Sequence, residues 1–182
     1  MVTIIVIAIA AVLVLWFVSV QRKLVGKDEM CKNSLSQIGV QQSSRWDALT
    51  ALAELVKSYN EHEYKTLMDV IAKRKSTDGN SSIEDIEIQE KAISGAIRQI
   101  NVVAEQYPEL KASENYSKAM DSVNTYENQV RMSRMVYNDS VTVYNRIIRQ
   151  IPDSLVAGIL HFAERKYLEV EQQKTAMPSM KI

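Results

Sequence analysis

The residues with the greatest chemical capacity surround the stretch VYNDSVTVYN, residues 136–145, in which the pair Tyr-Asn occurs twice. The two copies are seven residues apart, almost two turns of an α-helix, so both tyrosines would lie on one helix face with both asparagines beside them. A buried tyrosine hydroxyl needs a hydrogen-bond partner, and asparagine can satisfy polar groups between helices and fix their register. The heptad therefore predicts a polar seam, which we prefer, or a surface for a ligand or partner. The candidate residues are Glu127, Arg131, Arg134, Tyr137, Asn138, Tyr144 and Asn145.

Two of these charges need partners if the seam is buried. Glu127 and Arg134 fall on the same stripe as the tyrosines, and an unpaired charge in a helical seam is costly. Arg131 follows Glu127 by four residues, about one helical turn, and is therefore the nearest expected ion-pair partner.

Patterns typical of catalysis and of metal binding are absent from the sequence. The two histidines, His62 and His161, lie in neither H-E-x-x-H nor E-x-x-H, and Tyr59 stands where a di-iron bundle needs glutamate. Nucleophile-elbow, phosphate-loop and dinucleotide-binding glycine motifs are also missing. Cys31, the single cysteine, can form no internal disulfide and is expected to be a small apolar filler. We expect no enzyme activity, no cofactor and no metal.

Composition favours long helices and gives no reason to propose nucleic acid as a partner. The 182 residues include 22 basic and 22 acidic side chains, whereas phosphate binding needs a basic surplus gathered on one face. Only five glycines and three prolines leave few positions for turns. The sequence therefore predicts an all-α protein.

The N-terminus predicts a transmembrane anchor. Residues 2–20 carry no charge, and a helix of roughly 20 apolar residues crosses the hydrocarbon layer. A signal peptide is the alternative, but no basic residue precedes the run and no small-residue cleavage site follows it. Trp16 and Phe17 are expected at the headgroups, followed by the basic residues Arg22, Lys23 and Lys27. By the positive-inside rule, we expect a single-pass protein of the bacterial inner membrane with its N-terminus outside and its domain in the cytoplasm.

Apolar periodicity predicts an antiparallel bundle of long helices, similar to a four-helix bundle, after the anchor. Spacings of three and four residues recur with few interruptions, and turns are expected at a polar cluster, at Pro108 and at Pro152. Ser81 and Glu84 have the form of a capping box that opens the second helix. The predicted segments are an anchor with its flank (1–21), a bundle (22–174) with helices over 46–71, 84–107, 109–151 and 153–173, and a flexible tail (175–182).

Several motifs resemble the closing signature of the LemA family of bacterial membrane proteins. They are EQYPELKASENY (105–116), YENQV (126–130), YNDSVTVYN (137–145) and IPDSLVAGIL (151–160), and residues 36–63 resemble the first-helix motif of that family. The sequence departs from the usual pattern at Gly39, where aspartate is usual, and at Thr50, where proline is usual. The resemblance implies a helical bundle on one transmembrane helix. It implies little about activity, because the family has no agreed biochemical function.

Two functions of different class follow. The first is a membrane-anchored scaffold or interaction protein whose exposed helix faces bind unidentified membrane or envelope proteins, or a second copy of the chain. The second is a binding module in which the polar cluster accepts a ligand or peptide during envelope signalling or a stress response. A closed seam of mutually satisfied side chains would favour the scaffold, and an open cleft would favour the module.

Overall fold

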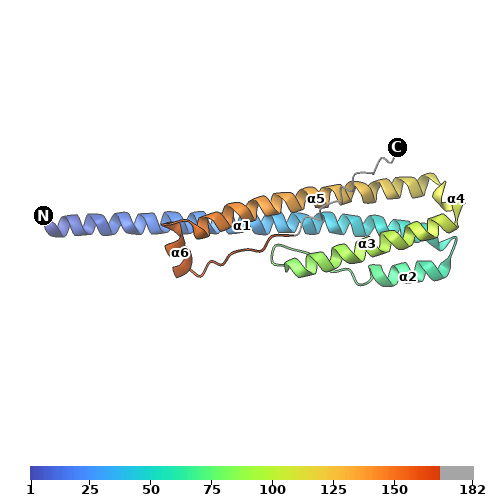
Figure 1. The fold of residues 1–182 in the computed structure, drawn as a ribbon, viewed down its shortest axis with the longest axis horizontal. Coiled ribbons are helices and arrows are strands. Elements are labelled where there is room, and N and C mark those ends of the chain that lie inside the picture. The colour runs from blue at the N-terminus through green and yellow to red at the C-terminus, as the bar shows by residue number, and fades with distance from the viewer. Residues whose placement is uncertain (169–182) are drawn as a thin grey trace, which may run out of the picture.

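The computed structural model describes residues 1–168 and is all-α in that range, which confirms the predicted fold class. Two long helices, α1 (Val2–Lys57) and α5 (Glu114–Arg149), lie side by side (Figure 1). The shorter helices α2 (Glu61–Ile71), α3 (Ile83–Gln106) and α4 (Pro108–Lys111) cover and close the half of this pair that is remote from the N-terminus. Helix α6 (Asp153–Ile159) lies at the opposite end.

Helix α1 passes without a break through the expected boundary between anchor and bundle. In the part of the chain that the structure describes, it is the one helix long and apolar enough to cross a membrane, as an anchor or as a signal segment. Residues 2–15 of α1 are exposed, whereas Trp16 and Phe17 are half-buried against the bundle. The candidate membrane segment and the bundle therefore share one helix.

Two predicted helices are each divided by a polar cap. The helix expected over 46–71 ends at Lys57, and the Asn60 side chain accepts hydrogen bonds from the backbone N–H groups of His62 and Glu63 to open α2. The helix expected over 109–151 is interrupted before Ser113, whose side chain caps α5. These predictions were wrong because the apolar period continues across both breaks, whereas the local hydrogen bonds of a cap decide where a helix begins.

Two smaller differences concern the ends of α3 and α6. Ser82, one residue later than predicted, caps α3, and its side chain exchanges hydrogen bonds with Asp85. The segment expected to be helical over 153–173 is helical only to Ile159. Residues 162–168, which we call the strap, have no regular secondary structure and run as an extended trace along the bundle (Figure 1). Residues 169–173 and the predicted tail lie outside the described part of the chain.

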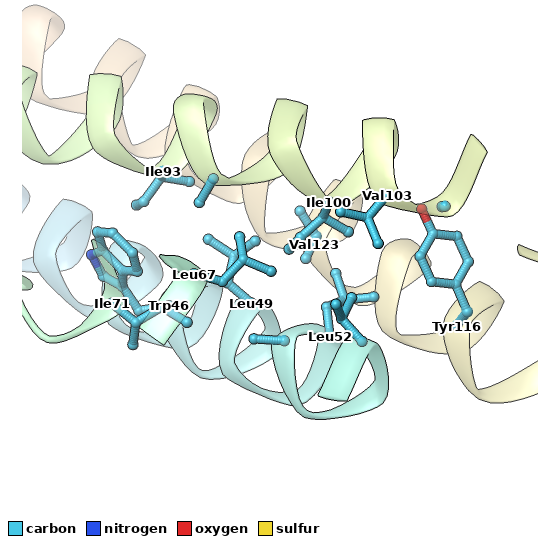
Figure 2. Packing of buried hydrophobic residues seen from close by; sticks show 14 of the residues in the cluster. Trp46, Leu49, Leu52, Leu67, Ile71, Ile93, Ile100, Val103, Tyr116 and Val123 are labelled. Carbon is cyan, nitrogen blue, oxygen red and sulfur yellow. The ribbon is translucent and has the colours of Figure 1, made fainter. Parts of the chain in front are cut away.

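The apolar core consists of three clusters along the length of the molecule. The remote cluster joins α1, α2, α3 and α5, and the predicted stripe of α3 is buried in it through Ile93, Ile100 and Ala104 (Figure 2). A middle cluster contains Cys31, Tyr137 and Tyr144, and a third contains Val20, Leu24 and the buried face of α6. The members of both clusters come mostly from α1 and α5.

Gly39 has a packing role in α1. A Cβ atom added there would lie 2.1 Å from the carbonyl oxygen of Thr77, in the turn between α2 and α3. The glycine therefore lets this turn lie directly against the helix, at the position where the resemblance led us to note a departure.

Candidate functional site

The two Tyr-Asn pairs of α5 hold the strap against the bundle. We call Tyr137, Asn138, Tyr144 and Asn145 the Tyr-Asn ladder. The Tyr137 hydroxyl donates to the Lys166 carbonyl oxygen and the Tyr144 hydroxyl to that of Ala163, each at 3.1 Å. Both rings are 2% exposed, so the hydroxyls are the polar ends of otherwise buried side chains.

The two asparagines each bind both main-chain groups of one strap residue. Asn145 Nδ2 donates to the Arg165 carbonyl oxygen, and its Oδ1 accepts from the Arg165 N–H, both at 2.9 Å. Asn138 does the same with Leu168, again at 2.9 Å for both bonds. Each side-chain amide thereby replaces the peptide group that a neighbouring β-strand would offer.

The seven-residue interval has a geometric explanation. Seven helical residues rise about 10.5 Å, and three extended residues advance about 10 Å. The asparagines bind residues 165 and 168, and the tyrosines bind residues 163 and 166, so each heptad step matches three strap residues. The repeat is therefore the spacing at which one helix face can bind an antiparallel extended chain at two successive places.

Side chains of the strap add contacts with α1 and α3. Arg165 pairs with Asp28 of α1 at 2.7 Å and lies 5.9 Å from the ring centroid of Tyr144. Lys166 pairs with Glu84 at the start of α3 at 2.8 Å. Leu168 is 2% exposed and belongs to the same apolar cluster as Cys31. The strap is thus bound through its main chain by the ladder and through its side chains by the two other helices.

Burial sets the protonation of the site. It raises the pKa of the Tyr137 and Tyr144 hydroxyls, which keeps both as donors, and it raises the pKa of the Cys31 thiol. Burial alone would lower the pKa of Arg165, but the hydrogen bond and charge of Asp28 outweigh it and raise that pKa. Burial therefore favours the neutral thiol and the two neutral phenols, and the contact with Asp28 favours the charged guanidinium of Arg165.

The charged candidates lie apart from the ladder bonds. Glu127 pairs with Arg45 of α1 at 3.0 Å, whereas the predicted partner was Arg131. Arg131 is exposed and donates to Asn128, and Arg134 is half-buried on α5. The expectation for Glu127 was wrong because a neighbouring helix offers a guanidinium closer than the next turn of α5 does.

Sequence reasoning missed Arg45, which is 2% exposed and also contacts Glu90 of α3. It also missed the pair of Asp28 and Arg165, which are 137 positions apart. Arg45 interrupts a buried apolar stripe directly before Trp46, which is the signal that could have identified it. No comparable local pattern marks the pair.

The residues expected at the membrane interface lie at the α6 end of the bundle. Trp16 and Phe17 pack against the third cluster, and Lys23 pairs with Asp153 of α6 at 2.7 Å. Arg22 is exposed on α1. In the described residues, no group of three or more His, Cys, Asp or Glu side chains could hold a metal ion.

Comparison with known proteins agrees with the motifs. No curated protein matches the chain. A family model described as the LemA family matches residues 34–182, which include the ladder, α6 and the strap. Since this match covers most of the chain, the protein belongs to the LemA family.

Proposed function

We propose that this protein is a membrane-anchored helical scaffold with no catalytic activity of its own. The observation that carries the proposal is the continuity of α1, which joins the apolar N-terminus to the bundle without a hinge. Beyond Val20 the helix continues to Lys57, a rise of about 55 Å at 1.5 Å per residue. Such a helix, packed along α5, holds binding surfaces at a fixed distance from the bilayer.

The state of the Tyr-Asn ladder supports the scaffold over the ligand module. Its four side chains are satisfied by the chain's own strap, so the polar seam is closed. The surfaces left for partners are exposed helix faces, such as the face of α5 that carries Met132 and Val136. We propose membrane or envelope proteins, or a second copy, as the partners.

Fluorescence energy transfer tests whether α1 holds the far end of the bundle at a fixed distance from the bilayer. A donor fluorophore on Lys57→Cys, with Cys31→Ala to remove the native thiol, is measured against acceptor lipids in a bilayer. We expect a single narrow distance near 55 Å from the membrane surface. A broad distribution of distances, or a short distance showing that the bundle lies flat on the membrane, would refute a rigid scaffold that stands away from the bilayer.

Orientation and contacts are tested in cells. Arg22, Lys23 and Lys27 support an N-terminus outside and a cytoplasmic domain, so protease added to spheroplasts should spare a C-terminal tag. A photo-crosslinking residue at exposed Met132 or Val136 should yield discrete products, whereas the same variants kept in the dark should yield none. Absence of products from every exposed helix position would contradict the scaffold.

A second candidate function is the binding of an extended peptide in place of the strap. It is favoured by one observation, that all six ladder bonds go to main-chain atoms, which any extended peptide offers. A chain ending at Leu160 would leave the ladder open. It should bind a synthetic peptide of residues 162–168 and not a scrambled version, with helicity checked by circular dichroism. Failure of a folded, truncated chain to bind the peptide would exclude this function.

A further inference from the structure

The exposed apolar side chains around α6 are unusual for a helix in contact with water. Ile151 is 80% exposed, Leu155 62% and Ile159 64%, and Leu160 follows directly. Single exposed apolar residues are common on protein surfaces, but four within ten positions form a concentrated patch. The α6 patch, defined as Ile151, Leu155, Ile159 and Leu160, therefore calls for a covering partner.

The position of α6 indicates what that partner is. Its buried residues, Val156 and Ala157, share a cluster with Val20 and Leu24 of α1, and Trp16 and Phe17 pack against the same cluster. Val20 is the last apolar residue of the N-terminal run, two positions before the first charged side chain, Arg22. Helix α6 thus lies at the level where that run ends and the charged part of the chain begins.

The direction of α6 also agrees with a position at the membrane surface. Figure 1 shows α6 running across the long axis of α1 and α5, at the end nearer the N-terminus. If α1 crosses a bilayer along its axis, a helix that runs across it lies near the plane of the membrane surface. This is the orientation of an interfacial helix.

The two faces of α6 are separated as an interfacial helix requires. At about 100° per residue, Leu155 and Ile159 lie roughly 200° and 240° around the helix from Asp153. Asp153 is held by Lys23, and Val156 and Ala157 flank it on the bundle side. Leu155 and Ile159 are consequently on the face turned away from the bundle.

Charge at the same end is suitable for headgroups. Arg22 of α1 and Arg146 of the last turn of α5 are both exposed. Basic side chains next to a membrane surface are attracted to anionic lipids, which adds to the burial of apolar area.

We propose that α6 is a second membrane contact, with Ile151, Leu155 and Ile159 inserted at the boundary between headgroups and acyl chains of the bilayer that α1 crosses. This proposal rests on the proposed membrane anchorage. The two contacts together fix the rotation of the bundle about α1, because one helix crossing a bilayer leaves that rotation free and a second point of attachment does not.

The test uses the full chain in vesicles of phosphatidylcholine and phosphatidylglycerol. An environment-sensitive fluorophore is attached to Leu155→Cys, with Cys31 replaced by alanine. The matched control carries the label on Val102→Cys, which is also exposed but lies near the far end of α3. We expect lipids with a spin label near the headgroup to quench the Leu155 label at least threefold more strongly than the Val102 label, with the reverse order for aqueous iodide.

Three results would overturn the contact. Equal iodide quenching at both positions in a chain that resists alkaline extraction would show that α6 is in water, while leaving the anchor intact. Protection from iodide without quenching by lipid would assign the patch to another protein surface, such as a second copy. Loss of the chain from the vesicles on alkaline extraction would refute the anchorage itself and this contact with it.

Discussion

Replacement of Asn145 by alanine tests whether the ladder holds the strap. The change removes two hydrogen bonds to Arg165 and leaves a backbone donor and acceptor without their partner. A hydrogen bond contributes about 1 kcal/mol net, and a buried group left unsatisfied costs about 1–3 kcal/mol. We therefore expect the strap to be less tightly held by about 2–4 kcal/mol.

The strap is expected to open before the bundle unfolds. It is bound at the surface of α1, α3 and α5, and these helices keep their other contacts when it leaves. At 1.4 kcal/mol per factor of ten, a loss of 2–4 kcal/mol raises the open population roughly 30- to 700-fold. The melting temperature of the helices should change much less. Once the strap is released, the substitution no longer affects the bundle, so the free energy of global unfolding can fall by no more than the free energy that held the strap.

Cys31 provides the assay. It is fully buried, it is the only cysteine in the chain, and it belongs to the apolar cluster that contains Leu168 of the strap. Burial raises its pKa, which further slows its reaction with a maleimide. When closing is faster than labelling, the labelling rate follows the open population, so Asn145→Ala should label roughly 30- to 700-fold faster than the native chain.

Two variants complete a graded series. Tyr144→Phe removes one hydrogen bond, about 1 kcal/mol, and should accelerate labelling about fivefold. Asn128→Ala changes an exposed asparagine of the same helix and should alter the rate by about twofold or less. If Asn145→Ala labels Cys31 at the native rate, the ladder does not hold the strap and the explanation of the heptad is wrong.

Three further predictions concern stability. Tyr137→Ala and Tyr144→Ala each remove a buried ring and should cost about 3–5 kcal/mol in urea unfolding, against about 0.5 or less for exposed Asp139→Ala; equal small effects would contradict burial of the rings. Burial raises the pKa of both tyrosines in the folded state, so their contribution to the free energy of unfolding is complete below about pH 10 and is lost as pH rises toward the folded pKa. Phenylalanine at both positions should therefore reduce the loss of stability at alkaline pH. An unchanged dependence of stability on pH would contradict this prediction. Gly39→Ala should destabilise, since the turn after α2 lies against it, whereas Gly26→Ala, with open space around it, should stabilise by about 0.5–1 kcal/mol; the same sign for both would disprove the close approach.

Local pattern determined much of the fold. The uncharged run of residues 2–20, the three-and-four spacing of apolar residues and the scarcity of glycine and proline were sufficient to predict an all-α chain with one candidate membrane helix. The buried stripe of α3 follows the same periodicity, and α5 ends at Arg149, shortly before Pro152, which cannot continue a helix. These features depend on residues within a few helical turns of one another, which is the range over which sequence periodicity carries information.

Only the tertiary structure decided what the Tyr-Asn heptad binds. The sequence placed Tyr137, Asn138, Tyr144 and Asn145 on one face of α5, but their partners are main-chain atoms 19 to 30 positions away, in a segment expected to be helical. Main-chain groups are the same in every residue, so no side-chain pattern identifies them as partners. The match between about 10.5 Å of helix and three extended residues exists only once α6 has turned the chain back along α5.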